Sequence, residues 1–245
     1  MQTPTSSQLL DAWAAAVPLA GSARALALVL LADPGAEPAR LASLPVGRRD
    51  AKLLELRNLL FGPTLRAVGN CPGCGERLEI DTDAGALAPA PNAVDAGGLE
   101  SIEIGLWTAQ FRVPNSRDLA AVEGQLDLVD ARRSLLASCL VRATYDGRPM
   151  ETDSIPDELA RAIGQRMAEL DPLVAPEVVA DCPACGHTWV ATFNLASFAW
   201  TEVDAWARRT LHQVHELATA YSWTEEAVLA LSAARRARYL ELVAG

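Results

Sequence analysis

Two copies of one short pattern, CPGCG at 71–75 and CPACG at 182–186, place the strongest constraint on how this chain folds. Two thiolates spaced by two residues can bind one metal ion at about 2.3 Å without strain. The glycine lets the chain turn back, so that backbone N–H groups point at the sulfur atoms. Two such knuckles that share one ion form a zinc ribbon. The predicted ligands of one structural zinc ion are Cys71, Cys74, Cys182 and Cys185.

The two knuckles are separated by the 107 residues from 75 to 181. A ribbon requires only that its knuckles meet in space, so a long segment between them is no obstacle. Each knuckle is followed by a strand-like run, RLEIDTD after the first and HTWVATFNL after the second. We therefore expect the intervening segment to be inserted at the tip of the hairpin between the knuckles.

Other uses of the cysteines have to be weighed. A thioredoxin-like redox pair lies between a strand and a helix, and neither copy does so here. Disulfides or unliganded thiols stay open, although five cysteines in a chain without a recognisable secretion signal favour a reducing compartment. Four thiolates would fill a tetrahedron and leave no position for a reacting water, so we expect a structural ion. His187 could replace one of the ligands. Because four cysteines are available, we expect it instead to be a turn residue or a residue that contacts the ligands without binding the ion.

Helical patterns flank the two knuckles. Half of the residues are hydrophobic, and apolar side chains recur at helical spacing before the first knuckle and after the second. The stretch ALALVLLA at 25–32 is too short to span a bilayer and predicts a buried helix. We therefore predict an α+β, mainly α-helical fold, with a split four-Cys zinc ribbon joining N- and C-terminal helical parts. The predicted parts are 1–70 (N-terminal helices), 71–83 (first knuckle and strand), 84–181 (acidic insert), 182–193 (second knuckle and strand) and 194–245 (C-terminal helices).

The predicted insert is acidic and mixed in structure. The segment between the knuckles carries 20 acids and 9 bases, a balance of −11, so it accounts for the net charge of −10 of the whole chain. Residues 84–98 have no apolar period and predict a linker. Alternation in 102–113 predicts a β-hairpin. Asn115, with Asp118 three residues on, predicts the start of a helix that runs through LLASCLVRA. A further helix is expected from 156 to about 170.

Aromatic and basic side chains gather after the second knuckle. Asn194 is expected to cap a long amphipathic helix, and Thr224 and Ser232 are expected to cap two shorter helices. Tryptophans exposed on these helices would anchor a partner protein. The arginines of RRARYLELV are either a solvated helix face or a contact for an acidic partner. The candidate partner-binding residues are Trp200, Trp206, Trp223, Arg235, Arg236 and Arg238.

Signatures of enzymes are missing from the sequence. The chain has no glycine-rich phosphate loop and no nucleophile elbow, and it contains only three histidines. His212 and His215 in HQVHE do not make the HExxH pattern, so we expect them to be solvated or packed. Cys139 lies on an apolar helix face and is expected in the core. The net charge of −10 argues against nucleic acid as a partner. We expect a protein that is not an enzyme and binds neither nucleic acid nor membranes.

Four blocks of the sequence together resemble one known family. They are GRRDAKLLELRNLLFGPTL leading into CPGCGERLEI; FRVPNSRDLAAV; DCPACGHTWVATFNLASFAWTEVDAWARRTLHQVH; and ELATAYSWTEEAVLALSAARRARYLELV. They are similar to the baseplate hub assembly chaperone family of contractile phage tails, which includes T-even phage proteins and relatives in extracellular contractile injection systems. The resemblance covers most of the chain and is least defined at 84–98. It leads us to expect glycine where this chain has Ser222.

The resemblance implies a non-enzymatic protein that helps to assemble the baseplate at the tip of a contractile tail, or forms part of it. Its partners would be baseplate hub, spike or wedge proteins. It would act in the cytoplasm during assembly, and then either leave or remain in the phage tail or injection-system particle. The zinc ion would serve stability rather than the shared function. The oligomeric state stays open, and the alternative is a zinc-ribbon adaptor for nucleic acid or another protein complex.

Overall fold

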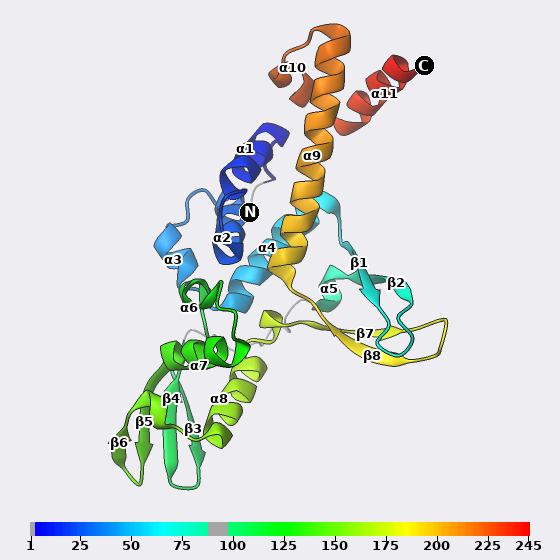
Figure 1. Ribbon diagram of the computed structural model, residues 1–245. Coiled ribbons are helices and arrows are strands. Elements are labelled where there is room, and N and C mark those ends of the chain that lie inside the picture. Colours follow the sequence, from blue (N-terminus) through cyan, green and yellow to red (C-terminus); the bar gives the residue numbers. More distant parts are fainter. Residues whose placement is uncertain (1–2, 88–97) are drawn as a thin grey trace.

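The fold is seen in a computed structural model, which describes residues 3–87 and 98–245. A helical body carries three projections, namely the acidic insert, a pair of hairpin arms and a C-terminal helical end (Figure 1). Helices outweigh strands, and four cysteines from two distant segments meet at the arms. The prediction of an α+β, mainly helical fold with a split four-cysteine site is confirmed. None of the helices in the described ranges combines the length and the apolar character needed to cross a membrane.

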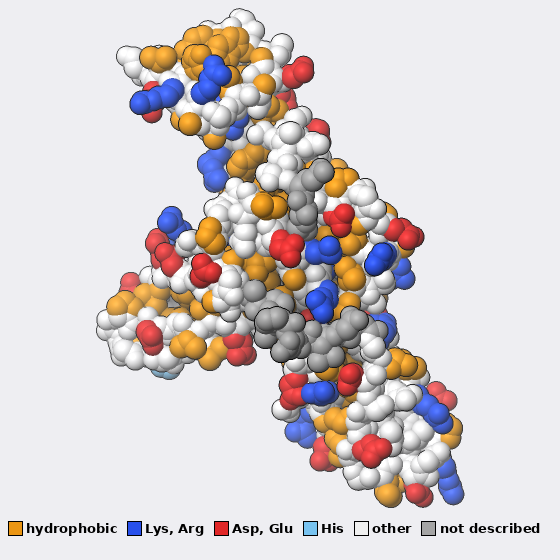
Figure 2. Space-filling model, turned by 180° about the vertical axis from the view of Figure 1, so that it is seen from behind, with side chains coloured by type: hydrophobic (Ala, Val, Ile, Leu, Met, Phe, Trp, Pro, Cys, Tyr) orange, Lys and Arg blue, Asp and Glu red, His pale blue; other side chains and the backbone are white. Residues whose placement is uncertain are grey.

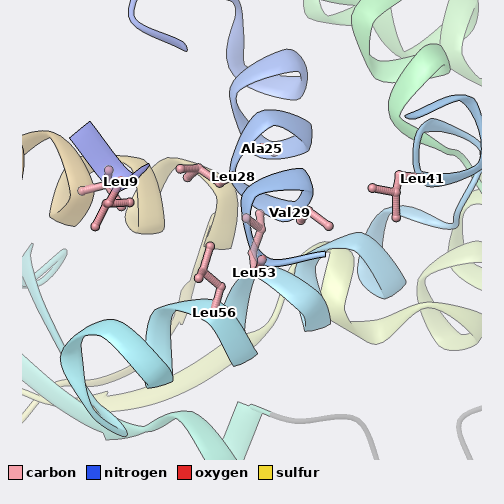
Figure 3. Packing of buried hydrophobic residues seen from close by; sticks show 9 residues of the cluster. Leu9, Ala25, Leu28, Val29, Leu41, Leu53 and Leu56 are labelled. Atoms are coloured by element: carbon pink, nitrogen blue, oxygen red, sulfur yellow. The ribbon is translucent and has the colours of Figure 1, made fainter. Parts of the chain in front are cut away.

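The body is built from the N-terminal helices and the first half of the longest helix. Its helices are α1 (Ser6–Ala16), α2 (Gly21–Ala32), α3 (Pro38–Ala42), α4 (Val46–Phe61) and α9 (Leu195–Tyr221). Leu28 and Val29 of α2 and Leu53 and Leu56 of α4 lie in one buried cluster (Figure 3), to which Val203 of α9 also belongs. Burial of each such side chain contributes about 1.5–3 kcal/mol. The N- and C-terminal parts of the chain therefore share a core.

Two antiparallel hairpins form the arms, and each has a Cys-Pro-x-Cys-Gly turn at its tip. The first pairs β1 (Thr64–Asn70) with β2 (Arg77–Asp83), and the second pairs β7 (Glu177–Asp181) with β8 (Thr188–Thr192). The strands after the knuckles, β2 and β8, agree with the prediction, whereas β1 and β7 fall in segments predicted as helical part and insert. Because each tip is closed by its own knuckle, the insert leaves from the opposite ends of the hairpins. The prediction that it lies at a hairpin tip is wrong.

The insert folds around a four-stranded antiparallel sheet with the strand order β3-β4-β5-β6. Its elements are α5 (Ala84–Leu87), β3 (Glu100–Ile104), β4 (Trp107–Phe111), α6 (Ser116–Val122), α7 (Leu128–Cys139), β5 (Leu140–Tyr145), β6 (Arg148–Met150), α8 (Asp157–Leu170) and the short 3-10 helices Thr152–Ser154 and Pro172–Val174. Phe111 and Ala143 of the sheet pack against Leu159 and Ile163 of α8. The predicted hairpin and the helix at 156–170 are confirmed. Of the predicted linker, only α5 and the residue at 98 fall within the described part of the chain.

One predicted helix of the insert is in fact two helices and a strand. The sequence pattern predicts a continuous helix from Ser116 through LLASCLVRA. Gly124 interrupts it with φ 86°, a left-handed conformation that glycine adopts readily. After Cys139 the chain enters β5, which pairs with β4 and places Leu140 and Ala143 in the core of the sheet. Pairing with a strand distant in sequence overrides the local helical pattern here.

Hydrogen bonds at the starts of α2 and α4 join the insert to the body. Gly47 N donates to Asp171 Oδ2 at 2.8 Å. Ser22 donates to Glu123 Oε1 from its backbone N at 2.7 Å and from its Oγ at 2.6 Å. Burial raises the pKa of Asp171, although the N–H of Gly47 and nearby arginines act in the opposite direction. The junction is thus a close approach between backbone and side chain, which requires a small residue at position 47.

Replacing Gly47 with alanine is expected to weaken this junction. An added Cβ would lie 1.9 Å from Asp171 Oδ1, so the carboxylate must move and the bond from the backbone N is lost. We expect the free energy of unfolding to fall by about 2 kcal/mol, as for other insertions of a methyl group into a packed site. Chemical denaturation measures the loss. Gly164→Ala in α8 is the matched control, since its nearest neighbour, Arg132 Nη2, lies 3.6 Å away. Equal losses in both variants would contradict the steric argument.

The C-terminal end comprises the second half of α9 with α10 (Glu225–Leu229) and α11 (Ala233–Ala244). Val214, Leu217 and Val228 form its small core. Because this core is separate from that of the body, the end of α9 extends away from the rest of the molecule (Figure 1).

Three aromatic rings cover one side of the C-terminal core. The ring centre of Trp223 lies 4.8 Å from those of both Tyr221 and Tyr239. Ser222 ends α9 with φ 55°, the left-handed conformation that glycine favours. That conformation gives a physical reason to expect glycine at this position.

Side-chain caps set where the predicted helices begin. Asn115 and Asp118 form the predicted capping box at the start of α6. Asn194 accepts a hydrogen bond from the first turn of α9 at 2.8 Å. Thr224 and Ser232 accept the corresponding bonds at the starts of α10 and α11. All four predicted caps are confirmed, because a cap depends only on residues within one helical turn.

Candidate metal centre

The four predicted ligands meet between the tips of the two arms. The Sγ atoms of Cys71, Cys74, Cys182 and Cys185 all lie within 4.8 Å of one another. Two pairs that join the arms, Cys71 with Cys185 and Cys74 with Cys182, have Sγ–Sγ distances of 3.7 Å. A tetrahedral ion with metal–sulfur bonds of about 2.3 Å needs sulfur atoms about 3.8 Å apart. All four thiols are free, and a disulfide would require about 2.05 Å. The donor set therefore fits one tetrahedral metal ion.

Matching backbone hydrogen bonds shape the two knuckles. Gly75 N donates to Cys71 O at 2.8 Å, and Gly186 N donates to Cys182 O at 2.8 Å. Gly75 has φ 79° and Gly186 has φ 73°, which explains why glycine follows the second cysteine in each copy. A further bond in each knuckle, Cys71 N to Glu76 O at 2.8 Å and Cys182 N to the carbonyl two residues past Cys185 at 2.9 Å, closes the hairpin. The repeated sequence therefore produces a repeated turn.

The electrostatics of the thiols depend on their position in the cluster. Cys71 and Cys182 are buried, whereas Cys74 and Cys185 are exposed. Burial raises the pKa of Cys71, but hydrogen bonds from the backbone N–H groups of Cys74 and Gly73 and from the thiols of Cys182 and Cys185 together outweigh it and lower the pKa to about 7. The backbone of Glu76 lowers the pKa of Cys74, but its contacts with the neighbouring thiols and burial together raise it to about 12. Thiols this close oppose one another's ionisation, and a bound cation relieves that repulsion.

His187 contacts the opposite knuckle without joining the ligand set. A Cβ on Gly73 would lie 3.2 Å from His187 Cβ, so the first knuckle packs closely against the second at this point. The imidazole stacks on Trp189 with ring centres 6.3 Å apart. In the described part of the chain, the four cysteines alone form a group that could hold an ion. His187 is thus a packing residue beside the site.

A direct contact also joins the helical parts, independently of the metal centre. Arg57 of α4 donates from Nε to Glu202 Oε2 of α9 at 2.7 Å and from Nη2 to Glu202 Oε1 at 2.8 Å. It also donates to the carbonyl oxygens of Gly62 and Thr64, where α4 passes into β1. The arginine side chain is only 4 % exposed. The sequence pattern did not single out this residue, because nothing local distinguishes it from a solvated arginine.

The predicted tryptophan anchors are half-buried and pack within the chain. Trp200 and Trp206 lie against the core of the body. The guanidinium of Arg24 lies 4.7 Å from the ring centre of Trp200, a cation–π contact. Trp223 packs in the C-terminal end. Their role in binding a partner stays a prediction, which concerns only the exposed part of each ring.

The three candidate arginines of α11 do not share one environment. Arg235 and Arg238 are exposed, whereas Arg236 is 3 % exposed. Arg236 Nη1 donates to Leu231 O at 2.7 Å, and its Nε donates to Gln213 Oε1 at 3.2 Å. The prediction of Arg236 as a partner contact is wrong, because α11 turns this side chain inward against α9.

The remaining candidates agree with their expected structural roles. His212 and His215 are exposed, and His212 Nε2 lies 3.2 Å from a carboxylate oxygen of Glu216. Cys139 is fully buried at the end of α7, and burial raises the pKa of its thiol.

The four-cysteine cluster can bind a metal ion and tie the arms together, and four sulfur ligands would leave no open coordination position. Comparison of the chain with known protein families, with curated proteins and with solved structures finds no match.

Proposed function

We propose that this protein is a non-enzymatic assembly factor or structural component of the baseplate of a phage-like contractile tail or contractile injection system. It acts by binding other proteins, with hub, spike or wedge proteins as its partners. The sequence resemblance supports the biological setting. The shape of the molecule supports the mode of action, because three projections from one body can contact several neighbours at once.

The observation that carries the proposal is the large surface of the chain. Its accessible surface is 14141 Å² for a mass of 26.1 kDa. A compact monomer of this mass exposes about 10,600 Å². The arms, the insert and the C-terminal end extend away from the body and contribute to this excess of about a third (Figure 1). Such a surface suits a subunit that is completed by its neighbours in an assembly.

The C-terminal end offers a surface for such a partner. Figure 2 shows hydrophobic side chains gathered at this end of the molecule, with Lys and Arg side chains beside them. Leu211 and Tyr221 of α9 and Leu242 and Val243 of α11 are exposed apolar residues here. Apolar area with arginine beside it is typical of the central part of a protein interface. Trp223, Arg235 and Arg238 belong to the same end, whereas Trp200 and Trp206 lie against the body.

The ion that we propose for the centre is zinc. Four cysteine thiolates in a tetrahedron are typical of structural zinc sites, although iron also binds such a set. When bound, Zn²⁺ would offset part of the mutual repulsion of the four thiolates, and the resulting cluster would remain negatively charged. Cys71, Cys74, Cys182 and Cys185 would hold the ion and thereby tie the two arms together. The ion takes no part in any reaction. Its role in the proposal is to orient the arms for binding.

Pull-down of the tagged full chain, co-expressed with the baseplate proteins of the same genome, tests the function. Recovery of a hub, spike or wedge protein at stoichiometric level is the expected result. Recovery of nucleic acid that resists moderate salt would instead favour the adaptor alternative. Recovery of neither class would contradict the proposal.

Charge reversal at the C-terminal end provides a matched test of the surface. Arg235→Glu with Arg238→Glu is expected to weaken binding of the recovered partner by about tenfold or more, because both side chains are exposed beside apolar area. Arg236 is left unchanged because it is buried. Arg142→Glu with Arg148→Glu, exposed on the sheet of the insert, makes the same change in net charge and is the control. Titration calorimetry measures both. Equal weakening in the two double variants would mean that net charge, not this surface, governs binding.

A further inference from the structure

Helix α7 of the insert is exposed over much of its length. Of its 12 residues, only Cys139 at the last position is buried. Leu128 and Val129 in its first turn are 81 % and 67 % exposed, and Leu126 just before it is 101 % exposed. Leu136 packs against the core of the insert, whereas the exposed apolar side chains lie at the start of the helix. Three large apolar side chains in so short a stretch indicate a surface that another molecule covers.

A groove of about 490 Å³ runs between α7 and α8. Val129 and Leu136 line it from α7, and Ile155 and Ala160 line it from the start of α8 and the segment before it. The volume lies in the range of binding sites for ligands and short peptide segments, about 300–1,000 Å³. The exposed side chain of Leu128 also lines the groove, and exposed Leu126, two residues before it, extends the apolar surface beyond the groove. This continuation favours an elongated occupant over a compact small molecule.

Three arginines line the same groove, although the insert as a whole is acidic. They are Arg132 and Arg133 of α7 and Arg161 of α8, with Asp157 as the one carboxylate in the described lining. Arg133 makes a single exposed contact, at 3.7 Å, with Asp130. Arg161 Nε donates to the backbone oxygen of Asp157 at 3.4 Å. Arg132 reaches across to α8, where its Nη2 lies near Gly164. The groove therefore combines an apolar floor with a basic rim.

We propose that this groove binds an acidic amphipathic segment of another protein. Apolar side chains of that segment cover Val129, Leu136 and Ile155, and its carboxylates pair with the arginines of the rim. Arginine holds carboxylates through two parallel hydrogen bonds, and an amphipathic helix laid in a groove presents apolar and charged residues at the required alternation. The inference does not depend on the baseplate assignment, because it follows from the charge and exposure of the insert alone.

The test uses the full chain and a designed probe. The acidic probe is a fluorescein-labelled amphipathic peptide that has leucine residues at helical spacing and glutamate residues at the positions between them. The basic counterpart carries lysine in place of every glutamate. Fluorescence anisotropy is expected to show binding of the acidic peptide and none of the basic one. Amide chemical shifts of the protein are expected to change at α7 and α8 and not at α11.

Two variants decide whether the groove is responsible. The double variant Arg132→Glu with Arg161→Glu is expected to weaken binding of the acidic peptide at least about tenfold, because it removes charge-assisted hydrogen bonds. The control is the double variant Arg142→Glu with Arg148→Glu, which changes two exposed arginines on the sheet of the same insert. It is expected to leave binding of the acidic peptide unchanged. The proposal is overturned if the acidic peptide does not bind, if both peptides bind equally, or if the control variant weakens it as much. It is also overturned if Val129→Asp abolishes a dimer seen by sedimentation of the wild type, since a second copy would then be the occupant.

Discussion

Replacing Cys182 with serine is expected to abolish metal binding while the helical body stays folded. The variant removes one of the four sulfur atoms that lie within 4.8 Å of one another, and it removes a buried one. Zinc measured by mass spectrometry is expected to fall from about one ion per chain to below about 0.1, because a structural site of this type needs its full ligand set. Hydrogen exchange is expected to accelerate in peptides that cover both hairpins, 64–83 and 177–192. Peptides from α2 and α4 should keep their protection, because the cluster around Leu53 and Val203 does not involve the ion.

Cys139→Ala is the control for loss of a thiol. Cys139 is buried at the end of α7, far in sequence from the knuckles, and lies outside the four-sulfur group. This variant should keep one zinc ion per chain. A Cys182→Ser protein that still holds one zinc per chain would contradict the shared centre. A protein that carries iron, with visible absorption, would contradict zinc while leaving the four ligands in place.

Replacing Arg57 with methionine is expected to lower the free energy of unfolding by about 3–5 kcal/mol. The substitution keeps most of the apolar stem but removes every donor. It leaves Glu202 without its partner and leaves the carbonyl oxygens of Gly62 and Thr64 without the bonds that they accept now. Because the Arg57 side chain is 4 % exposed and that of Glu202 only 26 % exposed, water can replace these bonds only in part. Urea denaturation followed by circular dichroism measures the loss.

Arg208→Met is the matched control for this effect. Arg208 pairs with Asp204 on the same helix at 2.8 Å, but the arginine side chain is 71 % exposed. Exposed pairs of this kind contribute little, because both partners are also solvated when apart. A loss in Arg208→Met as large as that in Arg57→Met would show that burial is not what makes the α4–α9 contact strong.

The burial of Arg236 and of Arg57 illustrates where sequence reasoning fails on this chain. Arg235, Arg236 and Arg238 look equivalent in RRARYLELV, yet only Arg236 is buried. Its partners Gln213 and Leu231 belong to α9 and to the turn after α10, and no periodicity within α11 specifies that contact. Arg57 is hidden in the same way, since its partner lies 145 positions away in the sequence.

The insert shows a second kind of failure. Its hairpin and capping box were predictable from alternation and from Asn115 with Asp118, because these depend on neighbouring residues. The strand β5 was not, since LVRATY follows a helix without interruption. It forms a strand because β4 offers free backbone groups beside it, and Leu140 and Ala143 gain burial there. Only the assembled sheet supplies that reason.

The sequence by itself determined the features that short-range chemistry encodes. Two CPxCG turns identified the four cysteines that meet, and single polar residues such as Asn194 identified helix starts, because a turn or a cap is satisfied within a few residues. The tertiary structure alone decided how these parts are arranged. It placed each knuckle at the tip of a complete hairpin, buried Arg57 and Arg236, and left the groove of α7 and α8 open. Burial depends on which distant segments meet, and the free energy of that choice is shared over the whole chain rather than written in any one stretch of it.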